Sequence, residues 1–393
     1  MPRRFPLLLT ALSLSLVAAC NHGATSAGSA LPGSSKGPSP APVLTAVRAT
    51  GRTVPWSSPL TVTVTNGTLD SASASAADGS TLAGTTSGDT WTSATTLVPT
   101  QTYTVVAQVR DDDGKTKTLA ETYVASAATQ VLHAVLAPGN GSVVGVAQPV
   151  VLHFDQPVKG RANRLAVEQR LTVTTTPAVE GAWRWYNSYE VHYHAQKYWA
   201  SGTRISVAAD FTGLHLAGTQ VWGATKPATS TFRIGIDYES VVDITAHTMR
   251  VFQAGKLIRT IKVSTGRDKY PTKGGVHIVL TREKVHTYNS ATVGIPTDSP
   301  DGYYEKLPWS MRISNGGAFV HANPATVGVQ GRRNVSHGCV NTSVTDAEWF
   351  YYHSQLGDPV DIIHAVVQPV RWDAGMADWN YTWAEWQAGN LDG

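Results

Sequence analysis

The chain has 393 residues, more than one hydrophobic core usually organises, so several domains are expected. Charged residues make up only 15% of it and Gly, Ser, Thr, Val and Ala are frequent, which favours exported β-rich domains over helical enzymes or disordered tails. The formal net charge is +3 and no segment clusters basic residues as a nucleic-acid footprint would, so no nucleic-acid partner is expected.

Residues 1–19 have the features of an export signal. Arg3 and Arg4 begin it, and a short apolar run ends in small residues directly before Cys20. The run is too short to span a bilayer comfortably as a helix, which favours a cleaved signal peptide. Val17–Cys20 resembles a bacterial lipobox, which implies a lipidated Cys20 and an anchor on the outer face of the cytoplasmic membrane. The alternative is ordinary cleavage beside an incidental cysteine.

Cys20 and Cys339 are the two cysteines of the sequence, so no disulfide framework is expected in this exported protein. If Cys20 carries lipid, Cys339 is a lone thiol in an oxidising compartment. It is then either a small buried side chain or a group with a chemical task.

Residues 20–41 are rich in Gly, Ser, Ala and Pro and predict a lipidated N-terminus with a flexible tether. Residues 42–127 follow with strand-like alternation, for example in Leu60–Thr65 and Tyr103–Val109. Turn signals separate these runs, as expected for a β-sandwich.

Residues 130–235 predict a second β-rich domain. Its candidate strands include Val150–Phe154, Tyr189–Tyr193 and Arg204–Ala208. Sandwich domains of this kind are often spacers or binding surfaces, so their fold alone assigns no function.

His192 and His194 lie two positions apart, so on a strand both would project from the same face. Two imidazoles at that spacing could share a zinc ion, but no further ligand with suitable spacing lies nearby. Ordinary histidines on a surface or in a groove are expected instead, and no metal.

Residues 237–365 predict a third domain with a different pattern. We expect three strands, Val241–Ala246, His247–Phe252 and Leu257–Val263, with a tight turn at Gly255–Lys256 between the second and the third. A short helix, Ala347–His353, and a returning strand, Pro359–Ile363, should follow.

Residues 366–393 form a tail that contains Trp372, Trp379, Trp383 and Trp386. The last three are spaced i, i+4 and i+7, which places them on one face if the segment is helical. Packing against the neighbouring domain is the favoured interpretation, and a sugar-binding platform is the alternative.

The segment from His321 to Asn341 contains the residues expected to carry the chemistry. A cysteine attacks as a thiolate and needs a base or a positive field to lose its proton at neutral pH. His321 and His337 are candidate bases for Cys339. Gly338 permits a sharp turn, whose successive amides can form an oxyanion hole. These features suit acyl transfer.

The sequence Ser336-His337-Gly338-Cys339-Val340-Asn341, with His321 fifteen residues before Ser336, resembles the signature of the YkuD-type L,D-transpeptidases. Further segments resemble parts of the actinobacterial members: Val263–Gly266 with Pro271–Thr272, Asp298–Tyr303 and Gly316–His321. The resemblance implies a mainly β fold. Two immunoglobulin-like β-sandwich domains, residues 42–127 and 130–235, would precede a β-rich catalytic domain, residues 237–365, and a short Trp-rich C-terminal extension.

The resemblance also implies a role for each matching residue. Cys339 would be the nucleophile, and His321 the base, oriented by the backbone carbonyl of Ala322. His337, Gly338 and Cys339 would supply the turn and the oxyanion amides. The implied substrate contacts are Tyr303, Gly316, Gly317, Ser336 and Asn341.

One position departs from the actinobacterial pattern. A tyrosine of the lid loop in those relatives is Val293 here. The departure puts the lid contacts and the substrate preference in question, and leaves the chemistry unchanged.

The implied reaction uses peptidoglycan stem peptides. The thiolate would attack the carbonyl before the terminal D-Ala of a tetrapeptide donor, and an amine of a second stem would complete a 3→3 crosslink. Water as the acceptor would make the same site an L,D-carboxypeptidase. Carbapenem β-lactams are expected covalent inhibitors, and no cofactor is implied.

Other protein classes fit less well. Papain-like and NlpC-type peptidases place the cysteine before the histidine, whereas here His321 precedes Cys339. Sortases share this order but typically differ around the cysteine and use a downstream arginine. A non-catalytic wall-binding lipoprotein would be expected to have a degraded site, and here Ser336–Asn341 is intact.

Overall fold

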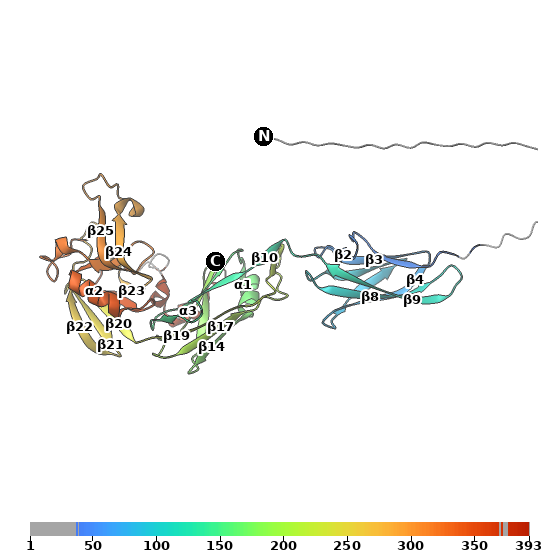
Figure 1. Ribbon diagram of the computed structural model, residues 1–393, viewed down its shortest axis with the longest axis horizontal. Helices are drawn as coiled ribbons and strands as arrows, with labels where there is room; N and C mark the ends of the chain where they lie inside the picture. The colour runs from blue at the N-terminus through green and yellow to red at the C-terminus, as the bar shows by residue number, and fades with distance from the viewer. Residues whose placement is uncertain (1–36, 38, 369–370, 372–375, 393) are drawn as a thin grey trace, which may run out of the picture.

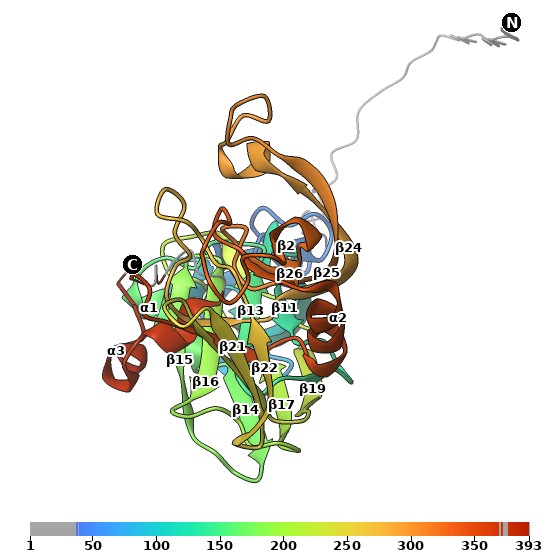
Figure 2. The same cartoon turned by 90° about the vertical axis from the view of Figure 1, so that its left-hand side faces the viewer.

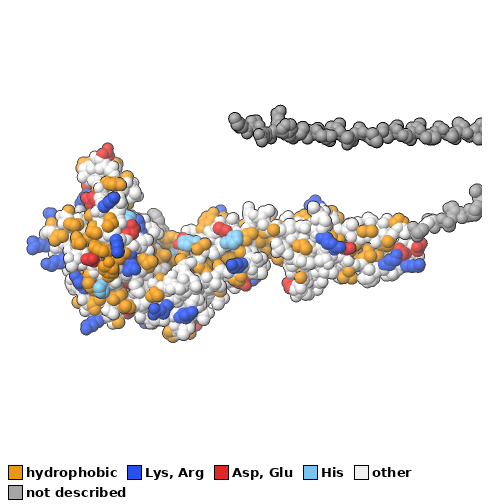
Figure 3. Space-filling model, viewed as in Figure 1, with side chains coloured by type: hydrophobic (Ala, Val, Ile, Leu, Met, Phe, Trp, Pro, Cys, Tyr) orange, Lys and Arg blue, Asp and Glu red, His pale blue; other side chains and the backbone are white. Residues whose placement is uncertain are grey.

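The computed structural model describes residues 37, 39–368, 371 and 376–392, so the export signal, Cys20 and Trp372 lie outside the described residues. Three β-rich blocks follow one another along the long axis of the molecule (Figure 1). On the face shown in Figure 3, acidic and basic side chains are interspersed over the three blocks. Among the described helices, none is long and apolar enough to cross a membrane.

The first block is a sandwich of two sheets, ordered β1-β3-β7-β6 and β2-β9-β8-β4-β5. Alternate residues of each inner strand point into the core, as Leu60, Val62 and Val64 do. Its strands are β1 Val43–Ala46, β2 Thr53–Val54, β3 Pro59–Thr65, β4 Thr68–Ala76, β5 Thr81–Leu82, β6 Gly84–Ser87, β7 Thr90–Thr96, β8 Thr102–Arg110 and β9 Thr116–Ala125.

The second block has two main sheets of four strands each, ordered β11-β13-β16-β15 and β12-β19-β17-β14, and a small third sheet of β10 and β18. Trp185 and Phe154 stack in its core, with ring centroids 5.4 Å apart. Its elements are β10 Gln130–Leu132, β11 Ala134–Ala137, β12 Val143–Val144, β13 Val150–Phe154, α1 Arg161–Glu168, β14 Leu171–Thr176, β15 Gly181–Asn187, β16 Glu190–Ala195, β17 Arg204–Ala209, β18 Val221–Gly223 and β19 Ala228–Ile234.

The third block packs a five-stranded sheet, β22-β21-β20-β28-β23, near a four-stranded sheet, β24-β25-β26-β27. Both sheets contribute to one core, for example through Val242 and Val320. Its elements are β20 Tyr238–Asp243, β21 Thr248–Gln253, β22 Lys256–Lys262, β23 Gly275–Ile278, β24 Thr281–Asn289, η1 Ser290–Val293, β25 Tyr304–Arg312, β26 Phe319–Ala322, η2 Pro324–Thr326, β27 Val340–Thr342, α2 Val344–His353 and β28 Pro359–Ile363. The hairpin of β24 and β25 rises from this block (Figure 2).

The local backbone corrects two predicted boundaries in the third block. The first strand ends at Asp243, because the Asp243 carboxylate accepts hydrogen bonds from the amides of Thr245 and Ala246 and turns the chain there. The next turn is centred on Ala254 and Gly255, which both have positive φ, and Lys256 already belongs to β22.

The tail forms two short elements, η3 Ala377–Asn380 and α3 Trp383–Gln387, instead of the single helix that the tryptophan spacing requires. Tyr381 between them is extended, and Thr382 starts α3 with a capping box. The prediction of one helical face is therefore wrong.

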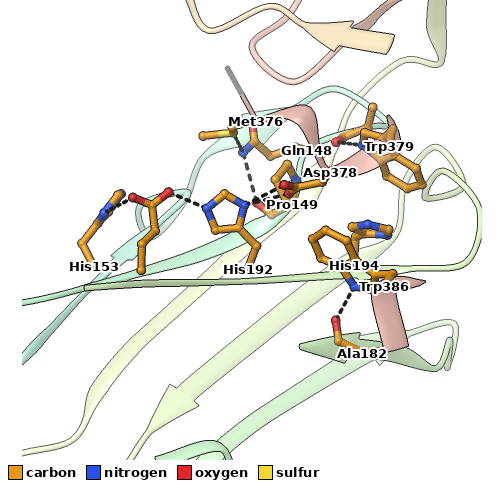
Figure 4. Close-up of polar contacts among 12 residues, drawn as sticks. Gln148, Pro149, His153, Ala182, His192, His194, Met376, Asp378, Trp379 and Trp386 are labelled. Carbon is orange, nitrogen blue, oxygen red and sulfur yellow. Dashed lines mark hydrogen bonds and ion pairs between the residues drawn. The ribbon is translucent and has the colours of Figure 1, made fainter. Parts of the chain in front are cut away.

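Trp379 and Trp386 of the tail nevertheless pack on the second block. The ring of His194 lies 4.1 Å from that of Trp379 and 3.9 Å from that of Trp386 (Figure 4). The Trp379 indole donates to the carbonyl of Ala147, and the Trp386 indole to that of Ala182. The tail therefore fastens the third block to the second.

The prediction of surface or groove positions for His192 and His194 is also wrong, because both side chains are buried. His192 lies between two carboxylates: its Nδ1 is 2.8 Å from Asp378 and its Nε2 is 2.5 Å from Glu190 (Figure 4). Burial alone would lower the pKa of His192, but the Asp378 and Glu190 carboxylates raise it to about 10. A protonated imidazole therefore joins the tail to the second block.

Replacing His192 by alanine is expected to lower the stability of the protein by roughly 3 kcal/mol, since it leaves a buried carboxylate unpaired. The folded-state pKa is raised, so this stabilisation is complete below the unfolded pKa of 6.5 and is lost as the pH rises through about 10. Thermal unfolding at pH 6 and above pH 10 measures both effects. His153→Ala is the matched control, because the His153 imidazole also contacts Glu190 but is exposed to solvent, where an ion pair contributes little to stability. Equal melting temperatures for the two variants would contradict the expectation.

Candidate active site

Strand register brings His321 and the segment around Cys339 together. Strands β26 and β27 are parallel neighbours, with Val320 opposite Val340 and His321 opposite Asn341. Residues opposite one another in a sheet point to the same face, so His321 and Asn341 lie side by side. Cys339 comes directly before β27 and is thereby held next to the end of β26.

A hydroxyl organises the turn that carries Cys339. The Ser336 hydroxyl donates to the Cys339 carbonyl at 2.6 Å and accepts from the Gly338 amide at 3.1 Å. Thr272 braces the same turn from outside, because its hydroxyl donates to the Gly338 carbonyl at 3.0 Å. Gly338 has a φ of +117°, a conformation that residues with a Cβ rarely adopt.

These contacts modify the expected oxyanion hole. The Gly338 amide is already bonded to Ser336, so it does not face a substrate in this structure. Within the described residues, no hydrogen-bond partner is found for the amide of Cys339. That amide is the one suited to receive a developing negative charge.

His321 has the geometry of a base. Its ring is buried, and its Nδ1 donates to the Ala322 carbonyl at 2.8 Å, which leaves the lone pair on Nε2. Burial lowers the pKa of His321 to about 4, although the hydrogen bond to Ala322 acts in the opposite direction. The imidazole is therefore neutral at pH 7 and able to take a proton.

The Cys339 side chain is half-buried, and its Sγ lies 3.7 Å from the Gly317 carbonyl. Burial raises the pKa of Cys339 to about 11, and the contact with the Phe319 backbone offsets only part of this effect. The resting site thus holds a neutral thiol beside a neutral imidazole. A thiol in this state has to lose its proton before or while its sulfur acts as a nucleophile.

His337 is held differently. Its Nε2 is 2.8 Å from Nη2 of Arg267, and its ring lies 4.9 Å from those of Tyr270 and Tyr303. Burial and the neighbouring Arg267 charge lower the pKa of His337. A guanidinium can only donate, so it occupies the Nε2 lone pair that a base would need.

Two cavities flank the thiol and share Tyr303, His337 and Cys339 in their walls. The larger, of about 240 Å³, also includes Ser336, His321 and Asn341 among its lining residues. The smaller, of about 110 Å³, is lined by Gly316, Gly317 and Val293. A reacting carbonyl at Cys339 could therefore be approached from two sides.

The structure thus gathers the site residues expected from the sequence, apart from Cys20, which lies outside the described residues. Ala322 contributes its carbonyl, as expected for a backbone role. Sequence reasoning singled out Pro271–Thr272 without assigning Thr272 a role. It missed Tyr288, whose ring lies 4.6 Å from that of His321, and the pair of Arg267 and Asp301. A tyrosine, an arginine and an aspartate far apart in the sequence give no indication that they belong to the site.

Within the described residues, no group of three or more His, Cys, Asp or Glu side chains is placed to hold a metal ion. The site's chemical groups are a thiol, imidazoles and backbone amides.

The chain is similar to known proteins over most of its length. Residues 237–362 match the L,D-transpeptidase catalytic domain YkuD, and residues 51–215 match a bacterial Ig domain. L,D-transpeptidase 2 of Mycobacterium tuberculosis is 35% identical over 84% of this chain and 80% of its own length. The chain belongs to the L,D-transpeptidase family.

Further relatives agree. L,D-transpeptidase 5 of Mycobacterium tuberculosis is 31% identical over 97% of this chain and 84% of its own length. The solved structure of the LD transpeptidase LdtMt1 in complex with imipenem superposes with a TM-score of 0.51, at 33% identity, over 60% of this chain and 99% of that one. These findings confirm the family, the mainly β class with an Ig-like region before the catalytic domain, and the transpeptidase function.

Proposed function

We propose that this transpeptidase works through a thioester on Cys339 and forms 3→3 crosslinks between peptidoglycan stem peptides. The observation that carries the proposal is a neutral His321 that lines the same cavity as Cys339, with its Nδ1 proton donated to the Ala322 carbonyl. Only Nε2 remains to accept the thiol proton.

In the first step, Sγ of Cys339 bonds to the carbonyl carbon before the terminal D-Ala of a tetrapeptide, and the thiol proton moves to His321. The amide of Cys339 stabilises the oxyanion. The bond to D-Ala then breaks, and the leaving amine takes the proton from His321. A thioester remains on Cys339.

In the second step, an amine of another stem peptide attacks the thioester and loses its proton to His321. The carbon–sulfur bond then breaks, and the departing thiolate takes that proton back from His321. The two cavities that share Cys339 support an acceptor peptide opposite the donor. Attack by water instead would release a tripeptide, which is the L,D-carboxypeptidase alternative.

The proposal is tested by incubating the protein with imipenem, the ligand of the related LdtMt1 structure, and measuring the intact mass. One adduct is expected, and it should map to the peptide that contains Cys339. An adduct on another residue, or an unmodified Cys339 after prolonged incubation, would contradict the thioester mechanism.

We further propose that Cys20 carries lipid and holds the protein on the outer face of the cytoplasmic membrane, reaching into the wall. A lipoprotein cysteine with at least two acyl chains gives stable anchoring. The wild type should stay in the membrane fraction after a high-salt wash, whereas Cys20→Ser should be released. The released variant should still react with imipenem. A Cys20→Ser protein that remains in the washed membranes would rule out this anchor.

A further inference from the structure

A second cluster of charged side chains lies beside the catalytic turn. The carboxylate of Asp301 is shared by three donors of one short segment: Arg267, Lys269 and Tyr270. Lys269 reaches it at 2.5 Å and the Tyr270 hydroxyl at 3.1 Å. Asp301 belongs to the loop of residues 294–303 that joins η1 to β25, so the cluster ties this loop to the segment that follows β22.

The loop is also held by hydrogen bonds of its own. The amide of Gly302 donates to the Ser299 carbonyl, and the Ser299 hydroxyl donates to the Pro296 carbonyl. Ser290 and Tyr303 close its base through reciprocal hydrogen bonds of 3.0 Å. Asp301 therefore places the loop as a unit, and with it Tyr303, which lines both cavities at Cys339.

Arg267 connects the same cluster to the catalytic turn. Its Nη2 contacts both Asp301 and Nε2 of His337, and its backbone amide donates to the Ser336 carbonyl at 3.1 Å. Because the guanidinium has no acceptor, Nε2 of His337 must be unprotonated and the ring proton must sit on Nδ1. Arg267 therefore selects one tautomer of His337.

We propose that Arg267 and Asp301 are positioning residues of the transpeptidation reaction, which fix the 294–303 loop beside Cys339 and orient His337. The proposal rests on the proposed function of Cys339. The ion pair acts through Tyr303 and His337, which form the walls of both cavities, and has no part in the bond-making steps.

Asp301→Asn is the main test, because it keeps the shape of the side chain and removes its charge. The rate constant for acylation of Cys339 by imipenem is expected to fall about tenfold at low salt, the effect of losing one charge-assisted hydrogen bond. Added sodium chloride should slow the wild type toward the variant and leave the variant almost unchanged, since salt screens partly exposed charge pairs.

Asp298→Asn is the matched control. It removes the same charge from the same loop, and among the described residues no partner is found for the exposed Asp298 side chain. Its acylation rate and salt dependence should equal those of the wild type. Hydrogen exchange of the 294–303 peptide should be faster in Asp301→Asn only, with melting temperatures of all three proteins alike.

The orientation of His337 has its own readout. Nitrogen chemical shifts of the labelled histidines should show His337 with an unprotonated Nε2 in the wild type, and a mixture of tautomers in Arg267→Gln. The proposal is overturned if Asp301→Asn and Asp298→Asn acylate equally, or if wild-type His337 carries its proton on Nε2. A wild type that forms no adduct on Cys339 would instead refute the proposed function.

Discussion

Replacing Cys339 by alanine is expected to abolish both the imipenem adduct and the formation of crosslinked dimer, because in the proposed mechanism the sulfur makes the covalent bond in each reaction. The fold should survive, since Sγ is held only by a 3.7 Å contact with the Gly317 carbonyl and a contact with the Phe319 backbone, and the turn is organised by the Ser336 hydroxyl. Mass spectrometry of a mixture of donor and acceptor stem peptides measures the dimer directly. An unchanged melting temperature would show that the loss is chemical.

Cys339→Ser is the matched comparison, because it preserves the size of the side chain and the Ser336-organised turn. Its hydroxyl is a far weaker nucleophile than a thiol, so acylation should still be lost or very slow. Formation of 3→3 dimer by Cys339→Ala at the wild-type rate would mean that another residue is the nucleophile.

Replacing His321 by alanine is expected to slow acylation by roughly 10²–10⁴-fold, the usual contribution of a general base. The residual rate should rise about tenfold per pH unit toward pH 11, as hydroxide replaces the missing base and the thiolate forms. Stopped-flow measurement of imipenem acylation against pH tests both expectations.

The wild type should show the complementary pH profile. His321 accepts a proton only when it is neutral, and its pKa is about 4. Acylation should therefore be nearly constant around neutral pH and fall as the pH drops through about 4, because the protonated imidazole has no free lone pair.

His337→Ala is the control that separates the two histidines. It also removes the contact with Arg267, so some loss of rate is expected through the geometry of the turn. It should keep the flat profile at neutral pH, since His321 is still present. If His321→Ala acylates normally and only His337→Ala fails, the roles of the two histidines are exchanged.

The sequence alone indicated the features that depend on neighbouring residues. Alternation in Leu60–Thr65 follows from the two faces of a strand, and Pro359–Ile363 forms the strand expected of it. The turn at Ser336–Cys339 is likewise local, because a hydroxyl two residues before a glycine can bond both to its amide and to the next carbonyl. These interactions span a few residues, so the local sequence is enough to predict them.

Tertiary structure decided what depends on contacts between distant segments. The β26–β27 register places His321 next to the turn that carries Cys339, and Arg267, which lies 70 residues from His337 in the sequence, contacts Nε2 of His337. The burial of His192 depends on Asp378, 186 residues away. Such contacts depend on which strands become neighbours and on how whole domains pack. Both are determined by the free energy of the complete fold, which a pattern of a few residues does not reveal.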